Sequence, residues 1–156
     1  MIRLALFEPD IAPNVGALMR LGACLGVPLE VIEPCGFVWD DKRLRRAGLD
    51  YRAAAEVTRH RSFDAFRESC PGRLILLTTK ATRPYPNLRF EPGDILLLGR
   101  ESAGVPEAIH ARADHRVRIP MRPGLRSINV TLAAAMVLGE ALRQTACFDP
   151  TMMETP

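Results

Sequence analysis

The 156-residue sequence lacks the long apolar runs, close cysteine pairs and histidine spacings that mark several common protein classes. No apolar stretch approaches the roughly 18–20 residues that span a bilayer. The apolar start ends at Glu8 and Asp10, which does not fit a signal peptide, so we expect a cytoplasmic protein without a membrane span. The four cysteines include no close pair and the three histidines show no metal-ligand spacing, so neither a redox CxxC motif nor a metal centre is expected.

The sequence also lacks the glycine-rich loops that bind nucleotide phosphates. The glycines after the first apolar run, Gly16, Gly22 and Gly26, are spread along a predicted helix and form no GxGxxG motif. Residues 99–104 have the spacing of a P-loop, but Val105 and Pro106 follow where Lys-Ser or Lys-Thr is needed. NAD and ATP sites are therefore disfavoured, and with them a flavodoxin-like nucleotide-binding module.

Lysine is scarce, and almost every basic residue is an arginine. Only Lys42 and Lys80 are lysines among 21 basic residues, in a chain of net charge +3. A GC-rich genome would produce this bias without any function. The alternative is that guanidinium groups hold RNA phosphates and stack on bases. The residues around Lys42 are the densest basic group, and they form either a solvated helix face or an RNA-binding patch.

Short β-rich apolar runs alternate with helical stretches, which predicts one α/β domain over residues 1–148, followed by a flexible tail over 149–156. The near-continuous apolar character of the runs is typical of a parallel sheet covered on both faces. The expected strands are residues 3–7, 29–32, 56–58, 74–78, 95–98 and 117–119. Helices are expected over 13–26, after a cap at Ser62, and from Ser127 to about residue 144.

The middle of the last predicted helix has almost no polar side. From Leu132 to Leu138 every residue is apolar. Because a helix that is apolar all round must be covered on all sides, two arrangements are open. Either a second subunit covers the outer face and the protein is a homodimer, or the helix lies at the centre of the monomer core.

Three predicted strands in the C-terminal half end in small or turn-forming residues, over 78–80, 99–101 and 120–121. Ligands in open α/β sheets bind outside the carboxyl ends of the strands. Three neighbouring loops there would enclose a small cofactor, and glycine at 99 and 104 would let the backbone come close to it.

Ordered segments covering residues 2–144 resemble the motifs of the SPOUT RNA methyltransferases. They are EPDIAPNVGALMRLGACLG, GFVWDDKRLRRAGLDY, LTTK, and DILLLGRESAGVPE followed by RIPMRPGLRSINVTLAAAMVLGEALRQ. The resemblance is strongest to the group that methylates the 2′-hydroxyl of the tRNA wobble nucleotide, a cytidine or modified uridine, in leucine tRNA. It implies an α/β fold with a helix-flanked parallel sheet and a C-terminal deep trefoil knot, a feature that general topology rules would not predict. It also implies a homodimer, S-adenosyl-L-methionine (AdoMet) as methyl donor, and the tRNA anticodon stem-loop as partner.

The resemblance also implies roles for individual residues. The implied cofactor-binding residues are Leu77, Thr78, Gly99, Glu101, Ile119, Met121 and Ser127. The implied catalytic residues are Asn14, Arg20, Ser127 and Asn129, and the implied RNA-binding residues are Lys42, Arg43, Arg45, Arg46 and Arg126. Since arginine stays protonated in proteins, our hypothesis is that Arg20 stabilises the developing alkoxide while a phosphate or water removes the proton. Asn14 and Asn129 are alternatively helix caps.

One departure and two alternatives accompany this interpretation. Members of the wobble-nucleotide group carry a tyrosine and a tryptophan in the last helix, where Gly139 and Leu142 stand here, which bears on RNA contact or dimer packing. The alternatives are a catalytically inactive knotted dimer that binds RNA, and an enzyme of the same family that acts on another RNA position. Retention of the implied catalytic residues favours an enzyme.

Overall fold

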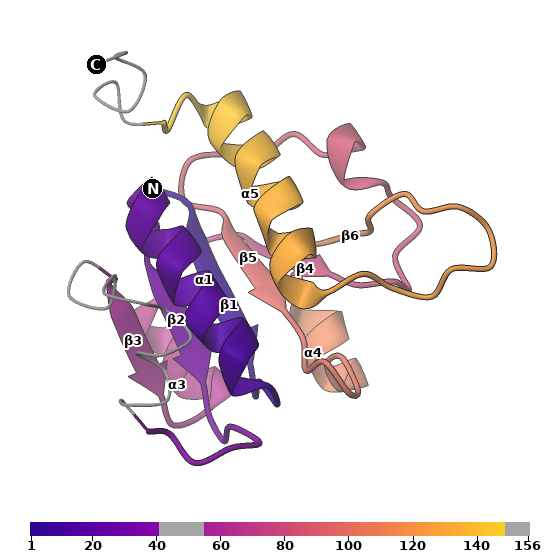
Figure 1. Ribbon diagram of the computed structural model, residues 1–156. Coiled ribbons are helices and arrows are strands. Elements are labelled where there is room, and N and C mark those ends of the chain that lie inside the picture. The colour runs from indigo at the N-terminus through magenta and orange to yellow at the C-terminus, as the bar shows by residue number, and fades with distance from the viewer. Residues whose placement is uncertain (41–54, 149–156) are drawn as a thin grey trace.

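The computed structural model describes residues 1–40 and 55–148. Within them, six parallel strands form one sheet in the order β3-β2-β1-β5-β4-β6 (Figure 1). The strands are β1 (Arg3–Phe7), β2 (Leu29–Ile32), β3 (Val57–His60), β4 (Leu74–Leu77), β5 (Ile95–Leu98) and β6 (His115–Val117). The helices are α1 (Ala12–Leu25), α3 (Phe63–Ser69), α4 (Glu107–Arg112) and α5 (Val130–Thr145), with a 3₁₀ turn η2 (Tyr85–Asn87). The predicted α/β class with a parallel sheet is confirmed.

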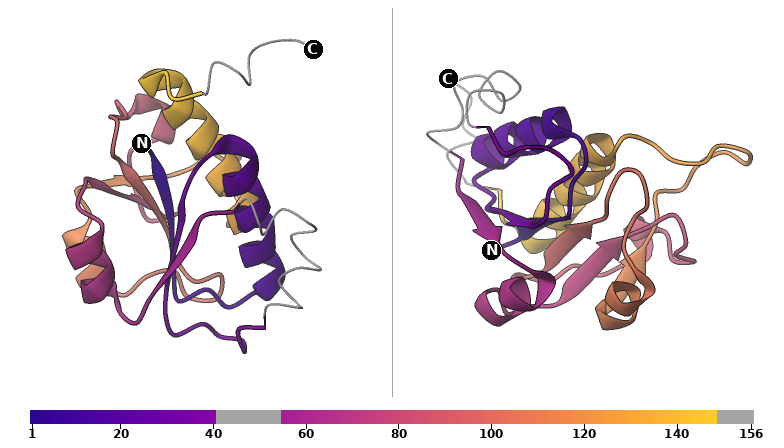
Figure 2. Two further views of the ribbon diagram at one scale, coloured as in Figure 1. Left: turned by 90° about the vertical axis from the view of Figure 1, so that its left-hand side faces the viewer. Right: turned by 90° about the horizontal axis from the view of Figure 1, so that it is seen from below.

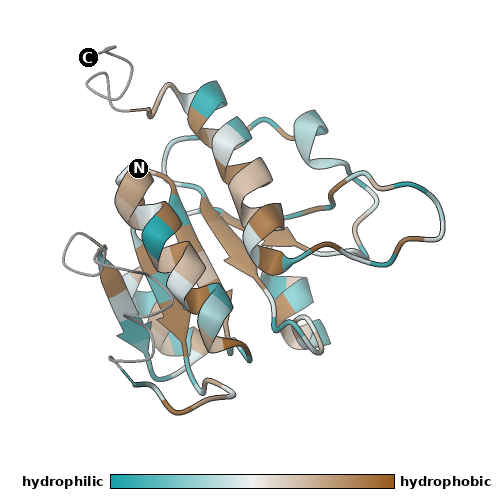
Figure 3. Ribbon diagram, viewed as in Figure 1, coloured by the Kyte–Doolittle hydropathy of each residue, from teal (hydrophilic) through white to brown (hydrophobic). Residues whose placement is uncertain are grey.

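Helices cover both faces of the sheet (Figure 2). Strand β1 shows why its run is continuously apolar: Leu4 and Leu6 pack in the core on the α1 and α5 face, whereas Ala5 and Phe7 pack on the α3 and α4 face. Successive strand residues point to opposite faces, so a strand covered on both sides needs apolar residues throughout. Strands β4 and β5 are accordingly hydrophobic along their length, whereas the edge strand β3 is largely polar (Figure 3). None of the described helices is long and apolar enough to cross a membrane.

Local signals set the ends of the helices. Helix α1 has a proline in its first turn and ends at Gly26, which adopts the left-handed conformation at φ 63°. The predicted cap of α3 is confirmed, because the Ser62 side chain accepts a hydrogen bond from the Ala65 amide at 3.1 Å. The Asn129 side chain caps α5 in the same way, with the Thr131 amide 2.8 Å away.

Two predicted strands are displaced in the structure. Strand β6 ends at Val117, so the prediction of a strand through Ile119 is wrong. Its partner β4 ends at Leu77, opposite Val117, and beyond it only a single bridge forms, between Arg118 and Pro84. Strand β3 begins one residue later than predicted and continues to His60. Helix α4, of six residues, was not predicted, because so short a segment shows no helical periodicity.

Strand β5 lies between β1 and β4, so it joins the N-terminal strands of the sheet to the C-terminal ones. β1 pairs with β5 from Arg3 opposite Ile95 to Leu6 opposite Leu98. Helix α1, which follows β1, packs beside α5 (Figure 1). The loop after β1, the loop after β5 and the start of α5 therefore lie close together at the carboxyl ends of the strands. The trefoil knot implied by the resemblance stays a prediction.

Candidate active site

A cavity of about 590 Å³ lies at the carboxyl ends of β4, β5 and β6. Leu98, Val117 and other apolar side chains form part of its wall, together with a few polar groups, which is the composition and size of small-molecule sites. Every predicted cofactor residue lines it, as do three further predicted site residues. This set is Leu77, Thr78, Gly99, Glu101, Ile119, Met121 and Ser127, with Asn14, Arg126 and Asn129. Sites predicted from three separate loops thus form one cavity.

A chain of hydrogen bonds joins three polar residues of the cavity wall. The Asn14 side-chain amide donates to Glu101 Oε1 at 3.0 Å, and the Asn129 amide donates to Asn14 Oδ1 at 3.2 Å. The other Glu101 oxygen accepts from the Asp10 backbone amide at 2.8 Å. Each bond fixes the next, so the orientation of Asn14 is set by an acceptor on one side and a donor on the other.

These contacts decide between the two interpretations of the asparagines. Asn14 is not a cap, because α1 begins after Ile11 with no side-chain cap bond, and the Asn14 side chain reaches across to Glu101 instead. Asn129 caps α5 and also contacts Asn14. The capping interpretation is therefore wrong for Asn14 and correct, though incomplete, for Asn129.

A charged clamp holds the loop after β5 against the loop after β1. Arg100 donates to Asp10 at 2.8 Å and to Glu8 at 3.1 Å, and Ser102 donates to the other Asp10 oxygen. Hydrogen bonds from Arg100, and then from Ser102, lower the pKa of Asp10 from 3.8 to about 2. This clamp was not predicted from the sequence. Carboxylates directly after β1 were a signal, but their partners are known only once β5 is placed beside β1.

Residues 99–104 form a tight closed loop. Arg100 and Gly104 exchange backbone hydrogen bonds of 2.9 and 2.8 Å, and Gly104 has a φ of 68°. A Cβ on Gly99 would lie 2.6 Å from the Gly104 carbonyl carbon, which is too close for any residue but glycine. The conformation of the loop itself therefore requires glycine at these positions, whether or not a ligand approaches the backbone there.

His110 is a buried polar residue of the cavity wall that the sequence analysis did not single out. Burial lowers the pKa of its imidazole from 6.5, so the ring is neutral at pH 7. A neutral ring adds no positive charge to the cavity wall. Its position on the short helix α4, absent from the prediction, explains why it was missed.

Arg20 is not among the residues that line the cavity. It lies exposed on α1, six residues after Asn14, which is about 9 Å along the helix axis. The structure therefore brings together three of the four predicted catalytic residues within one chain, and the role of Arg20 stays a prediction. The predicted RNA-binding residues Lys42, Arg43, Arg45 and Arg46 lie outside the described residues.

Helix α5 presents an apolar stripe to the outside. Leu132 and Met136 on this helix are 59% and 43% exposed, and Ile128, which precedes the helix cap Asn129, is 37% exposed. Ala134, Val137 and Leu138 on its inner face are fully buried. The helix is therefore not the centre of a monomer core, and that alternative is wrong for the described chain.

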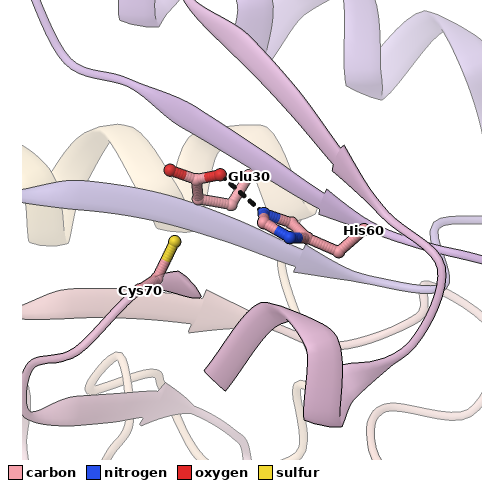
Figure 4. A group of neighbouring side chains, drawn as sticks. All are labelled: Glu30, His60 and Cys70. Atoms are coloured by element: carbon pink, nitrogen blue, oxygen red, sulfur yellow. Dashed lines mark hydrogen bonds and ion pairs between the residues drawn. The ribbon is translucent and has the colours of Figure 1, made fainter. Parts of the chain in front are cut away.

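A second group of titratable side chains lies at the β2–β3 edge of the sheet, away from the cavity. Potential ligand atoms of Glu30, His60 and Cys70, all buried, lie within 4.8 Å of one another (Figure 4). Glu30 binds His60 through one oxygen at 2.8 Å and Arg3 through the other at 2.8 Å. Burial raises the pKa of the Cys70 thiol. Because both carboxylate oxygens are occupied by protein donors and the thiol is protonated, the group is an internal hydrogen-bond network.

Comparison with known proteins shows the family to which the chain belongs. The SpoU rRNA Methylase family matches residues 1–139, and the chain belongs to this family. A relative from Beijerinckia indica, named tRNA (cytidine(34)-2′-O)-methyltransferase, is 57% identical over 152 residues, which cover 96% of this chain and 95% of the relative.

Two solved structures have the same fold. One, described as giving structural insights into the 2-OH methylation of C/U34 on tRNA, is 39% identical with a TM-score of 0.88, over 92% of this chain and 95% of that chain. The other is the SpoU methyltransferase AviRb from Streptomyces viridochromogenes in complex with the cofactor AdoMet. It is 26% identical with a TM-score of 0.79, over 92% of this chain and 60% of that chain. The predicted family and fold class are confirmed.

Proposed function

We propose that this protein transfers the methyl group of AdoMet to the 2′-hydroxyl of nucleotide 34, the wobble nucleotide of tRNA, leaving S-adenosyl-L-homocysteine. The observation that carries the proposal is the single cavity, lined by all seven predicted cofactor residues and bordered by the Asn129–Asn14–Glu101 chain. The 57% identity to a tRNA (cytidine(34)-2′-O)-methyltransferase supports the choice of substrate. Leucine tRNA and its anticodon stem-loop are the predicted partners.

The residues of the cavity fit AdoMet. The apolar walls at Leu98, Val117 and Ile119 suit an adenine ring, and the Glu101 carboxylate at the wall suits a positively charged ligand. The neutral His110 imidazole does not oppose that charge. When bound, AdoMet supplies a methyl group that is already activated for transfer.

With an activated methyl group, orientation of the ribose hydroxyl supplies much of the acceleration. The Asn129–Asn14–Glu101 chain provides fixed polar groups on which a ribose can be positioned. In our hypothesis Arg20 stabilises the alkoxide as the proton leaves, and a phosphate or water accepts that proton. Ser127, at the cavity wall before α5, is the fourth residue of this predicted set.

We further infer that the protein acts in the cytoplasm as a homodimer without a metal ion. The exposed stripe of Ile128, Leu132 and Met136 supports the dimer, because an apolar helix face of this kind is normally covered. The basic residues around Lys42 and the exposed Arg126 are proposed to contact the anticodon stem-loop.

Incorporation of tritiated methyl groups into unmodified bulk tRNA tests the reaction directly. We expect AdoMet-dependent incorporation, with 2′-O-methylated nucleosides from position 34 identified by mass spectrometry. Incorporation at another position would support an enzyme with a different target. AdoMet binding by calorimetry without incorporation into any tRNA would support the inactive RNA-binding dimer.

The substitution Arg20→Lys tests the role of Arg20. Because lysine also carries a positive charge, we expect a measurable single-turnover rate if charge stabilisation is its main contribution. A complete loss of rate with intact RNA binding would contradict pure charge stabilisation.

A further inference from the structure

Two segments beside the cavity contain basic residues and no acidic ones. Residues 78–90 and 115–130 together hold seven arginine and lysine residues and no aspartate or glutamate. Because the whole chain has a net charge of +3, the remaining residues carry a net charge of −4. The two segments therefore carry a net charge of +7 against −4 for the rest of the chain.

Four basic side chains of these segments have no carboxylate partner, unlike six of the arginines elsewhere. Six arginines elsewhere in the described residues form ion pairs with carboxylates: Arg3, Arg59, Arg73, Arg100, Arg112 and Arg143. Lys80, Arg83, Arg122 and Arg126 are exposed and form no ion pair within residues 1–40 and 55–148. We call these four residues the basic rim. Within the described part of the chain, no carboxylate neutralises their charge.

The fold joins the two segments at the mouth of the cavity. Arg118 donates its amide to the Arg83 carbonyl at 2.9 Å, and Tyr85 donates to the Arg118 carbonyl at 3.0 Å, so the segments run side by side. Lys80 and Arg126, one from each segment, line the cavity itself. Both segments lie on the side of the molecule opposite β3 (Figures 1 and 2).

We propose that the basic rim is a phosphate-binding surface for the substrate RNA, which holds backbone phosphates next to the nucleotide whose ribose enters the cavity. This inference rests on the proposed function and adds a binding surface separate from the residues around Lys42. Four exposed cations without a carboxylate partner in the described chain, two of them at the cavity, fit a polyanion, and guanidinium groups bind phosphate oxygens in pairs. Contacts of this kind set the register of the RNA without reading its sequence.

The test uses Arg83→Gln and Arg122→Gln, singly and combined, since neither residue lines the cavity. Binding of unmodified bulk tRNA is measured between about 50 and 200 mM salt, where the affinity falls with a slope of about 0.9 for each phosphate contact. Each single variant should lower that slope by about 0.9, and should bind about 8-fold more weakly at 0.1 M salt. The double variant should show the product of the two losses.

Arg61→Gln is the matched control, because Arg61 is exposed at the turn after β3, on the opposite side of the molecule. It should bind RNA as the unsubstituted protein does, and all four variants should bind AdoMet with unchanged affinity. If the double variant kept the RNA affinity and salt slope of the unsubstituted protein, the proposal that the basic rim binds phosphates would be overturned. An equal loss of RNA affinity in Arg61→Gln would also overturn it. A protein that binds tRNA through the rim but never methylates it would keep this inference and contradict the proposed function.

Discussion

Two groups of hydrogen-bonded polar residues in this protein have opposite surroundings. Asn14, Glu101 and Asn129 lie at the carboxyl ends of the strands and border a cavity. Glu30 and His60 are 2% and 7% exposed, under helix α3, and do not line that cavity. Both groups contain carboxylates and hydrogen-bonding partners, yet only the first has room for a ligand.

The difference shows that an adjoining cavity, and not the types of residue present, distinguishes a ligand-binding site from a structural hydrogen-bond network. Glu, His and Cys are ordinary metal ligands, and a list of residue types would rank the Glu30 group as the stronger candidate. Its carboxylate, however, is already shared between Arg3 and His60. Glu101 instead uses its two oxygens to hold the cavity wall, and Asn14 and Asn129 remain at the edge of open space.

The largest effect should come from Glu101→Gln, which removes a charge and one acceptor from the cavity wall. We expect methyl transfer to tRNA to slow about 100-fold, because even a 1 Å misplacement of Asn14 costs that much. The thermal unfolding temperature should change little, since Glu101 is only half-buried. Glu68→Gln, exposed on α3, is the matched control and should keep full activity. A Glu101→Gln protein with the unsubstituted single-turnover rate would contradict the positioning role.

Glu30→Ala should have the opposite pattern of effects. It should lower the stability of the fold and leave ligand binding in the cavity unchanged. Removing the carboxylate leaves His60 without its buried partner, which costs roughly 1–3 kcal/mol in unfolding free energy. The unfolding temperature should fall by about 2–10 °C, whereas AdoMet affinity measured by calorimetry well below that temperature should not change. Glu68→Ala serves as the control for helix α3. Loss of AdoMet affinity in folded Glu30→Ala would show that the two groups are coupled.

Much of this arrangement was predictable because its signals are local. The apolar runs over 29–32 and 95–98 coincide with β2 and β5, and Ser62 caps α3 as predicted. Loops after buried parallel strands are where ligands bind, so the cavity could be placed before its geometry was known.

What could not be predicted depends on which segments become neighbours. The pairing of β1 with β5 joins residues about 90 positions apart, and only that pairing brings Arg100 to Asp10. The same holds for Glu30 and His60, whose contact requires β2 and β3 to be adjacent. Arg20 was placed at the site by resemblance alone, and nothing local to α1 indicates whether it reaches a substrate.

The smallest expected effect is the contribution of the Asp10 clamp to stability, which should be measurable from its dependence on pH. The pKa of Asp10 is lowered from 3.8 to about 2 by Arg100 and Ser102, so its ionised form is favoured by folding. This contribution is fully present above about pH 4 and is lost as the pH falls towards 2. Asp10→Asn lacks the ionised form at every pH. The difference in unfolding temperature between the two proteins should be constant from pH 7 to about 4 and shrink below.

Comparing the two proteins isolates the clamp from other acidic groups. Glu140, whose pKa is also lowered to about 2, by Arg143 and Gln144, titrates in the same range but does so in both proteins and cancels in the difference. Direct titration of the Asp10 carboxyl carbon by NMR is the second measurement, and should give a midpoint near pH 2. A midpoint near 4 would mean that Arg100 and Ser102 do not hold the Asp10 carboxylate in solution, and the loop at 99–104 would then be attached to the loop after β1 through the Arg100–Glu8 ion pair and the bond from the Asp10 amide to Glu101.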